Sequence, residues 1–341
     1  MWYFFTPFVL LLTLLSPDTR SDERRQMEHR EAARYSKLHA FVEKNVTANY
    51  DVVYQRLELE VDPAIYKVSG DVTTWFKAVS SMQDITFELA GELNVTQVTM
   101  RAQPLSFAHE SNLLTIQLPQ TVSPGLLDSL SIKYSGQPPR TQQAFTTTTI
   151  ARKPVLYTLS QPYGAKDWWP CKQSLNDKID SIDVIITAPS QYTAVSNGVL
   201  KGVTTVANGK KRTAFKHRYP IPAYLVAIAV AEYEVYSHTV GTGVDAFPIV
   251  NYIYPGSLSQ ARQNTPITVE IMEFFESVFG PYPYRNEQYG HAQFGWSGGM
   301  EHATISFMGS FQTDLIAHEL AHQWFGNQIT CGSWSDIWLN E

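Results

Sequence analysis

Residues 313–341 read TDLIAHELAHQWFGNQITCGSWSDIWLNE, and this stretch decides how the rest of the chain is interpreted. His318 and His322 are four residues apart in an apolar run without proline, which favours a helix. On a helix, both imidazoles leave the same face about one turn apart and can bind one metal ion. The alternative is a pair of ordinary histidines on a helix surface. The spacing predicts a zinc site.

Two carboxylates complete the predicted site. Glu319 stands between the histidines, where its carboxylate can lie beside the metal and act as a base toward a water molecule. Hydrolytic zinc sites use three protein ligands, so a third is expected. Glu341 is the candidate, because the eighteen residues between it and His322 leave room for the helix to end near Gly326 and for residues 336–341 to return.

A second motif, Gly298-Gly299-Met300-Glu301-His302, lies upstream of the predicted metal helix. Adjacent glycines let the backbone pass close to a ligand and offer N–H and C=O groups to it. Glu301 adds a fixed negative charge. The α-amino group of a peptide has a pKa of about 8 and is largely protonated at neutral pH, so this carboxylate would select chain termini over internal bonds. Alone, the motif would be a loop with an exposed acid.

Together these motifs resemble those of the M1 zinc aminopeptidases, gluzincins that include aminopeptidase N and leukotriene A4 hydrolase. The family's zinc motif falls on His318, Glu319, His322 and Glu341. Its exopeptidase motif falls on residues 298–302, where His302 replaces the family's Asn. A third match, QPYGAKDWWPC at residues 161–171, is similar to a family segment whose first residue contacts the substrate amine.

The resemblance implies one Zn²⁺ per chain, held by the two histidines and Glu341, with Glu319 as the general base. It implies that Gln161, Gly298, Gly299, Met300 and Glu301 bind a peptide with a free N-terminus. It also implies a β-rich saddle domain followed by a thermolysin-like catalytic domain. Family members continue well beyond the position that matches Glu341, so the chain is expected to be an N-terminal fragment, inactive by itself.

From about residue 50 to 236 the apolar residues recur with a period of two. In RLELEV, Leu57, Leu59 and Val61 point one way and the charged residues between them point the other way, which is typical of a strand on a core. The same pattern predicts further strands at residues 71–76, 84–89, 112–118 and 129–134.

Turn and helix signals add detail. Asn197-Gly198 and Asn208-Gly209 predict type I′ hairpins, and the apolar run 224–230 predicts a central strand. A helix is predicted from Thr265, its cap, to Gly280. Its expected apolar face consists of Ile267, Ile271, Phe274, Phe275 and Val278. Thr313 is the expected cap of the metal helix.

These patterns predict an α+β multidomain chain, divided near the small and polar run at residues 237–245. The expected parts are a signal peptide or N-terminal anchor (1–20), a charged helical or flexible spacer (21–48), a β-rich N-terminal domain (49–240) and an incomplete thermolysin-like zinc domain (241–341). The apolar residues 2–16 are short for a membrane-spanning helix. Export to the periplasm or the extracellular space is therefore expected, with membrane anchoring as the alternative.

Composition limits the possible functions. The chain has 341 residues, 44% of them hydrophobic, which is enough for a substantial core. Its net charge of −6, without a basic stripe, argues against nucleic acid as a partner. Cys171 and Cys331 are expected to be free, buried thiols, although a bridge between them stays open. Trp168 and Trp169 are expected in the core rather than at the substrate.

The resulting hypothesis is a zinc metalloaminopeptidase that removes N-terminal residues from peptides. One alternative is a catalytically silent zinc-scaffolded remnant that acts as a binding module, although such a module has no need of Glu319. Another is an epoxide hydrolase of the same family, which only a substrate assay distinguishes. The sequence leaves the oligomeric state and the side-chain preference at the cleaved residue open.

Overall fold

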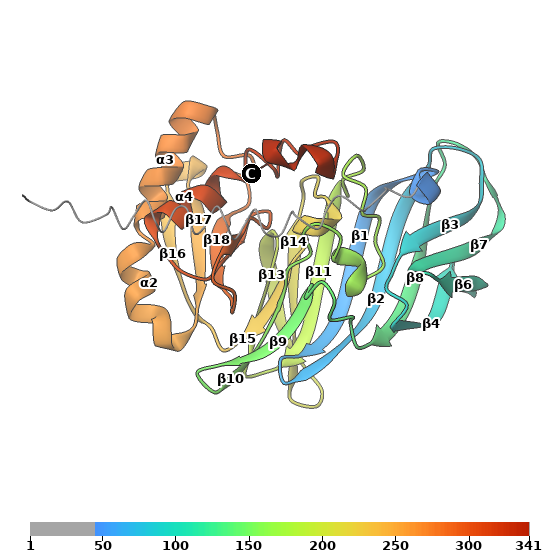
Figure 1. Cartoon of the computed structure of the whole chain (residues 1–341), viewed down its shortest axis with the longest axis horizontal. Helices are drawn as coiled ribbons and strands as arrows, with labels where there is room; N and C mark the ends of the chain where they lie inside the picture. Colours follow the sequence, from blue (N-terminus) through green and yellow to red (C-terminus); the bar gives the residue numbers. More distant parts are fainter. Residues whose placement is uncertain (1–44, 341) are drawn as a thin grey trace, which may run out of the picture. The chain divides into compact units, whose positions relative to one another are not determined.

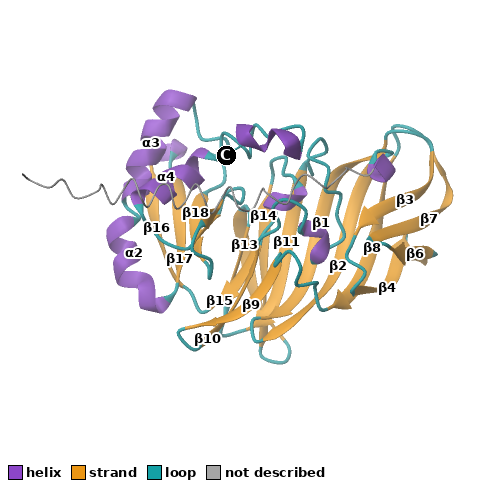
Figure 2. Ribbon diagram, in the orientation of Figure 1, coloured by secondary structure: helices purple, strands orange, loops and turns teal. Residues whose placement is uncertain are grey.

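The computed structural model describes residues 45–340, which form four β-sheets and three α-helices (Figure 1). Strands dominate the first two thirds of this range, and the α-helices come after them (Figure 2). The predicted α+β class, with a β-rich part first, is confirmed. Among residues 45–340, no helix is long and apolar enough to cross a membrane. The segments 1–20 and 21–44, with their predicted leader and spacer, lie outside the described residues.

The largest sheet has eight strands. Their order is β13 (Val199–Val206), β14 (Lys210–His217), β11 (Ser181–Pro189), β1 (Tyr50–Asp62), β2 (Ile65–Ala78), β8 (Leu127–Gly136), β4 (Leu93–Met100) and β5 (Gln103–Pro104). Neighbours are antiparallel except β1 and β11. On β1, Leu57 and Leu59 are buried, whereas Glu58 pairs with Arg212 of β14 at 2.9 Å. The predicted alternation is confirmed, because one face of this strand covers the core.

Two smaller sheets complete the β-rich part. The three-stranded sheet has the order β3 (Met82–Glu88), β7 (Leu113–Val122) and β6 (Phe107–Glu110). The four-stranded sheet has the order β12 (Thr193–Ser196), β15 (Ile228–Ala231), β10 (Lys153–Thr158) and β9 (Phe145–Ile150). The four strands predicted after β1 all match observed strands, with ends that differ by a few residues.

The last sheet carries the helices. Its order is β16 (Glu234–Val240), β17 (Phe247–Ile253), β18 (Tyr289–Gln293), β20 (Ser306–Met308) and β19 (Gly299–Met300). The helices are α2 (Leu258–Asn264), α3 (Ile267–Phe279) and α4 (Thr313–Ala321). Helix α3 packs on β16 and on α4, and α4 packs on β19 and β20 (Figure 1). The predicted metal helix therefore lies beside the strand that contains Gly299, the second glycine of the pair.

Short 3-10 turns connect several of these elements. They comprise Asn45–Thr47, Ala165–Asp167, Ala223–Leu225, Gly243–Asp245, Pro255–Ser257 and Trp334–Leu339. The last of these contains part of the predicted return segment 336–341. The domain boundary at residue 240 stays a prediction, but the change of sheet comes earlier, because β16 already pairs with β17.

One of the two hairpin predictions is wrong. Asn208 and Gly209 both have positive φ angles, 61° and 68°, and join the paired strands β13 and β14, as a type I′ turn requires. At the other site only Gly198 has a positive φ, 78°. The strands on either side of it, β12 and β13, belong to different sheets. The Asn197-Gly198 pair therefore marks a crossing between sheets.

Two further local predictions also need correction. The run 224–230 begins with a 3-10 turn, and only Ile228–Ala231 forms a strand, because Pro222 and Ala223 start a turn there. On α3, Phe274 is 61% exposed and Val278 56% exposed, while Thr268 and Met272 are the buried residues. The buried face is thus rotated from the predicted one, because the helix has more apolar surface than the sheet covers.

The caps of two helices differ from those predicted. Pro266 is the N-cap of α3, while Thr265 ends α2 and its hydroxyl bonds the Ala261 carbonyl oxygen at 2.9 Å. Gln312 is the N-cap of α4, without a capping side-chain hydrogen bond, so Thr313 is the first helical residue. Helix α4 is therefore fixed by its packing and not by its cap.

The sheet crossing at Gly198 gives a stability prediction. An added Cβ at Gly198 would lie 2.1 Å from the Lys216 carbonyl oxygen, whereas one at Gly209 would meet nothing within 4 Å. Both residues have positive φ. We expect Gly209→Ala to lower the free energy of unfolding by about 1 kcal/mol, from backbone strain alone. Gly198→Ala should lower it by about 2–5 kcal/mol, since a steric clash is added. Urea unfolding measures both, and equal losses would contradict the structure.

Candidate active site

The two histidines of the metal motif face each other across one turn of helix. His318 Nε2 lies 3.0 Å from His322 Nε2, and the ring planes are 85° apart. His322 Nδ1 is 3.2 Å from the Phe325 carbonyl oxygen and can donate a hydrogen bond to it. That bond leaves the lone pair on His322 Nε2, which points toward His318. Two imidazole nitrogens thus converge on one point.

This arrangement fits a zinc ion. With Zn–N bonds of about 2.0–2.1 Å, two histidine ligands in tetrahedral geometry have nitrogen atoms roughly 3.3 Å apart. Glu301, Glu319 and His322 also each offer an atom such that all three atoms lie within 4.8 Å of one another. Nitrogen and carboxylate ligands are those that zinc prefers. Glu341, the predicted third ligand, lies outside the described residues.

Glu319 is buried against the backbone of the glycine pair. Its side chain lies on the same helix as the histidines and is 1% exposed. An added Cβ at Gly299 would lie 2.0 Å from Glu319 Oε1, so any larger residue there would displace the Glu319 side chain. Gly299 is therefore needed for close approach, and the base candidate is held between the metal helix and β19.

Glu301 is held from two sides. Its carboxylate oxygen Oε1 accepts a hydrogen bond from Gln161 Nε2 at 3.2 Å. Its backbone carbonyl oxygen accepts from Asn327 Nδ2 at 2.6 Å and from Gln323 Nε2 at 3.3 Å. The side chain is buried, with the residue 4% exposed. Structure and sequence thus agree in bringing Gln161 and Glu301 together, although 140 residues separate them.

The glycine pair belongs to a sheet edge. Gly299 and Met300 form β19, which pairs only with β20 in the sheet of the described residues. Gly298 joins it through a 2.8 Å hydrogen bond from Gly309 N to its carbonyl oxygen. An edge strand offers backbone donors and acceptors to an extended peptide. Gly298, Gly299 and Met300 therefore lie at the edge of this sheet, and their role in substrate binding stays a prediction.

His302, which departs from the family pattern, is fully buried. Its ring packs edge-on against Phe307 of β20, with centroids 4.4 Å apart. His302 therefore packs the loop that contains Glu301 against β20.

Sequence reasoning missed the residues that connect the two parts of the chain at this site. Asn197 donates to the Ala303 carbonyl oxygen at 2.8 Å, and Gly198 N donates to Thr304 Oγ1 at 2.7 Å. Lys178 donates to the carbonyl oxygens of Asn327 and Gln328. The Asn197-Gly198 pattern predicts a hairpin instead, and an isolated Lys or Thr has no pattern that signals such contacts.

The segment 161–171 has a mixed role. Gln161 reaches Glu301, but Trp168 and Trp169 are fully buried, so the prediction of core packing for them is confirmed. Trp168 Nε1 donates to Ser160 Oγ at 2.9 Å. Cys171 and Cys331 are buried and are not in a disulfide, as expected, and burial raises the pKa of Cys171 well above its usual value.

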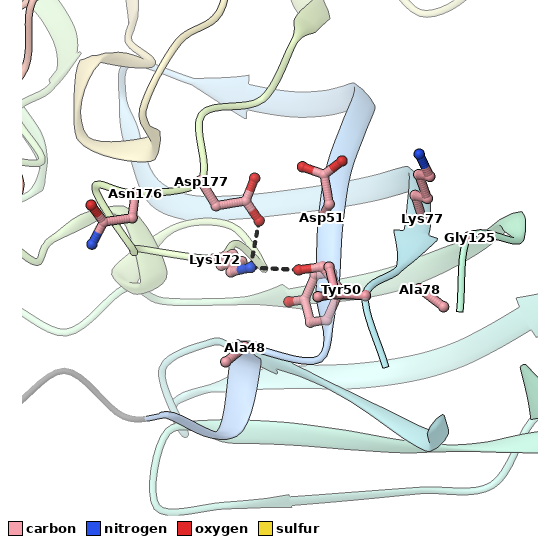
Figure 3. Close-up of a pocket in the computed structure, with 10 residues that line it drawn as sticks. Ala48, Tyr50, Asp51, Lys77, Ala78, Gly125, Lys172, Asn176 and Asp177 are labelled. Carbon is pink, nitrogen blue, oxygen red and sulfur yellow. Dashed lines mark hydrogen bonds and ion pairs between the residues drawn. The ribbon is translucent and has the colours of Figure 1, made fainter. Parts of the chain in front are cut away.

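A cavity of about 550 Å³ lies in the β-rich part, away from the predicted site residues (Figure 3). Lys172 forms an ion pair with Asp177 there and donates to the Tyr50 carbonyl oxygen at 2.6 Å. Burial, followed by the charge of Asp177, raises the pKa of Asp51. Asn176 also lines the cavity, and its amide bonds the Gly332 carbonyl oxygen at 3.2 Å. The ion pair therefore fixes the segment that continues to Lys178.

Two protein-family domains match the parts of the chain that contain the metal helix, Glu301 and the β19 edge. Residues 46–225 match the Peptidase M1 N-terminal domain, and residues 264–341 match the Peptidase family M1 domain. The chain belongs to the peptidase M1 family. The two matched stretches correspond to the β-rich part and to the part with the metal helix, so the M1 chain has both components in the expected order.

Individual relatives of the M1 chain are aminopeptidases. It is 29% identical over 252 residues to endoplasmic reticulum aminopeptidase 1 of Homo sapiens, covering 67% of this chain and 26% of the relative. It is 29% identical over 234 residues to glutamyl aminopeptidase of Rattus norvegicus, covering 62% and 24%. The M1 chain thus spans about a quarter of the length of these curated relatives.

Solved structures of similar fold are M1 zinc metallopeptidases. A two-domain member bound to L-tryptophan has a TM-score of 0.78 and 26% identity, covering 86% of this chain and 68% of that one. The M1 zinc metallopeptidase of Deinococcus radiodurans has a TM-score of 0.75, with the same identity and coverage. A mutant of that enzyme was solved with a Tyr-Ser-Ala substrate.

Metal content tests the histidine pair. We expect the purified protein to bind one zinc ion per chain and His318→Ala to lose it, because one of two converging nitrogens is removed. Plasma mass spectrometry after dialysis measures the metal. The matched control is His109→Ala, a histidine of β6 whose ring bonds the Leu89 carbonyl oxygen. Full zinc retention by His318→Ala, with the control unchanged, would refute the assignment.

Proposed function

We propose that this M1 chain provides the metal site and the amine-binding site of a zinc aminopeptidase that removes N-terminal residues from peptides. The observation that carries the proposal is the position of Glu301. Its carboxylate is buried, is bonded to Gln161 and lies within 4.8 Å of ligand atoms on Glu319 and His322. An acid beside the metal site limits the length of substrate that can extend past it.

Zinc fits the nitrogen atoms of His318 and His322, and when bound it supplies a Lewis acid for water and for the scissile carbonyl group. Glu341 is the proposed third ligand. Glu319 lies on the same helix and takes the proton of the attacking water, then passes it to the leaving amine. Its burial against Gly299 restricts the carboxylate to few orientations, which favours proton transfer along a fixed path.

Glu301 and Gln161 recognise the substrate's free amine. The ammonium group donates hydrogen bonds to the Glu301 carboxylate, and the Gln161 side chain can accept another. The backbone of Gly298, Gly299 and Met300 binds the peptide in an extended conformation. Structural relatives that bind L-tryptophan and L-arginine hold free amino acids, which have the same unblocked amine. Export from the cytoplasm, suggested by the apolar residues 2–16, is a separate proposal.

The general-base role is tested by Glu319→Gln. The substitution keeps the size and polarity of the side chain but removes the proton acceptor, so turnover should fall by roughly two to four orders of magnitude. Zinc content should not change, because both histidines remain. Hydrolysis of an aminoacyl-arylamide by the zinc-loaded full-length protein, which includes the residues that follow Glu341 in family members, measures turnover. Turnover like that of the wild type would exclude Glu319 as the base.

Selection of a free N-terminus is tested by Glu301→Ala. A charge-assisted hydrogen bond of about 1.5–3 kcal/mol corresponds to a preference of roughly ten- to hundredfold for a free over a blocked amine. The full-length wild-type enzyme should therefore cleave an aminoacyl-arylamide and not its N-acetyl form. In Glu301→Ala both KM and kcat should worsen, because the substrate is also misplaced. Equal wild-type rates on both substrates would indicate an endopeptidase cleft.

A further inference from the structure

The backbone of the Glu301 loop is bonded to the segment that follows the metal helix. Asn327 Nδ2 and Gln323 Nε2 both donate to the Glu301 carbonyl oxygen, at 2.6 and 3.3 Å. Both amides are fully buried, so water does not compete for this carbonyl group. Neither residue is itself a predicted metal ligand or a predicted substrate contact. Their common target is the peptide group next to the Glu301 side chain.

Gln323 also fixes the far side of the loop. Its Oε1 accepts a hydrogen bond from Thr304 N at 2.9 Å, so one side chain bonds the loop at residues 301 and 304. Thr304 has a φ of 67°, a conformation that a β-branched residue rarely adopts. Such a conformation persists only where the surroundings hold it. Here Gln323 and Gly198 N, which donates to Thr304 Oγ1, are those surroundings.

Asn327 connects the loop to the metal ligand and to the β-rich part. Its backbone N–H donates to the His322 carbonyl oxygen at 3.1 Å. Its own carbonyl oxygen accepts a hydrogen bond from Lys178 Nζ at 2.9 Å. A displacement of Asn327 would therefore move the Glu301 peptide group relative to the helix that carries His322.

We propose that Gln323 and Asn327 are positioning residues for substrate-amine recognition, a role that rests on the proposed function. They fix the peptide group that follows the Glu301 α-carbon, and the direction of the Glu301 side chain follows from that backbone. The carboxylate then stands at a set distance from the metal helix. Without the two amides the strained loop relaxes, and Glu301 meets the substrate ammonium with poorer hydrogen-bond geometry.

Two variants remove these bonds. Gln323→Met keeps the length and the buried packing but loses the amide donor and acceptor, and Asn327→Ser shortens the donor. Each should weaken the preference for a free over an N-acetylated amine by roughly five- to tenfold, with zinc content unchanged. The matched control is Asn251→Ala, which removes another fully buried amide, on β17, that bonds His291. The control should leave this preference as it is.

The preference is measured in two ways on the zinc-loaded full-length protein. One is the ratio of kcat/KM for an aminoacyl-arylamide and its N-acetyl form. The other is the ratio of the dissociation constants of L-tryptophan and N-acetyl-L-tryptophan, by calorimetry, which does not depend on turnover. Wild-type protein is measured first. If it has no preference, the proposed function fails, and the positioning role fails with it.

A double-mutant cycle with Glu301→Ala separates positioning from general loss of structure. Residues that act through Glu301 should have no further effect once its carboxylate is gone, so Gln323→Met should change the preference by less than about twofold in that background. Equal losses in both backgrounds would show that Gln323 acts elsewhere. An unchanged preference in the single variants would overturn the proposal. If Gln323→Met does not fold, the same cycle with Asn327→Ser and Glu301→Ala tests the positioning role.

Discussion

The contact between Gly299 and Glu319 constrains the rest of the site. Because a Cβ at Gly299 would lie 2.0 Å from the Glu319 carboxylate, β19 and α4 can approach this closely only with glycine at that position. The sheet order places β19 at the edge, where β20 is its one neighbouring strand among the described residues. The base candidate and the proposed peptide-binding edge are thus joined by one packing contact.

The site is also a junction between the two parts of the M1 chain. Gln161 bonds the Glu301 carboxylate, Asn197 bonds the Ala303 carbonyl oxygen, and Lys178 bonds the carbonyl oxygen of Asn327. All three donors come from the β-rich part, and all three acceptors lie in the part that carries the metal helix. The β-rich part therefore contributes hydrogen bonds to the site. It fixes the loop at residues 301–303, before the metal helix, and the turn at Asn327, after it.

Two lysines of the β-rich part, Lys172 and Lys178, are stabilised in different ways. Lys172 is paired with Asp177, which compensates its removal from water. Lys178 instead bonds carbonyl oxygens, and burial lowers its pKa. These carbonyl groups belong to the turn that follows α4, so Lys178 joins that turn to the β-rich part.

Spacing along the sequence determined the local features of this protein. The four-residue interval between His318 and His322 is enough to place both rings on one turn, because helix geometry is fixed by the backbone. The alternation of buried and charged residues in β1 is likewise local, because successive side chains of a strand point to opposite faces. The resemblance added Gln161, which no local pattern connects to Glu301. Glu341 and the N-terminal segments stay predictions.

Tertiary structure decided the contacts between distant segments and the faces that are buried. The Asn197-Gly198 pair has the composition of a hairpin turn, but pairing of β12 and β13 with other strands made it a crossing between sheets. The exposure of Phe274 and Val278 on α3 depends on which neighbours the helix meets, and composition does not specify them. The left-handed backbone of Thr304 is stable only because Gln323 and Gly198, far apart in sequence, bond it. Local sequence fixes backbone periodicity, whereas hydrogen bonds between distant residues depend on the complete packing of the chain.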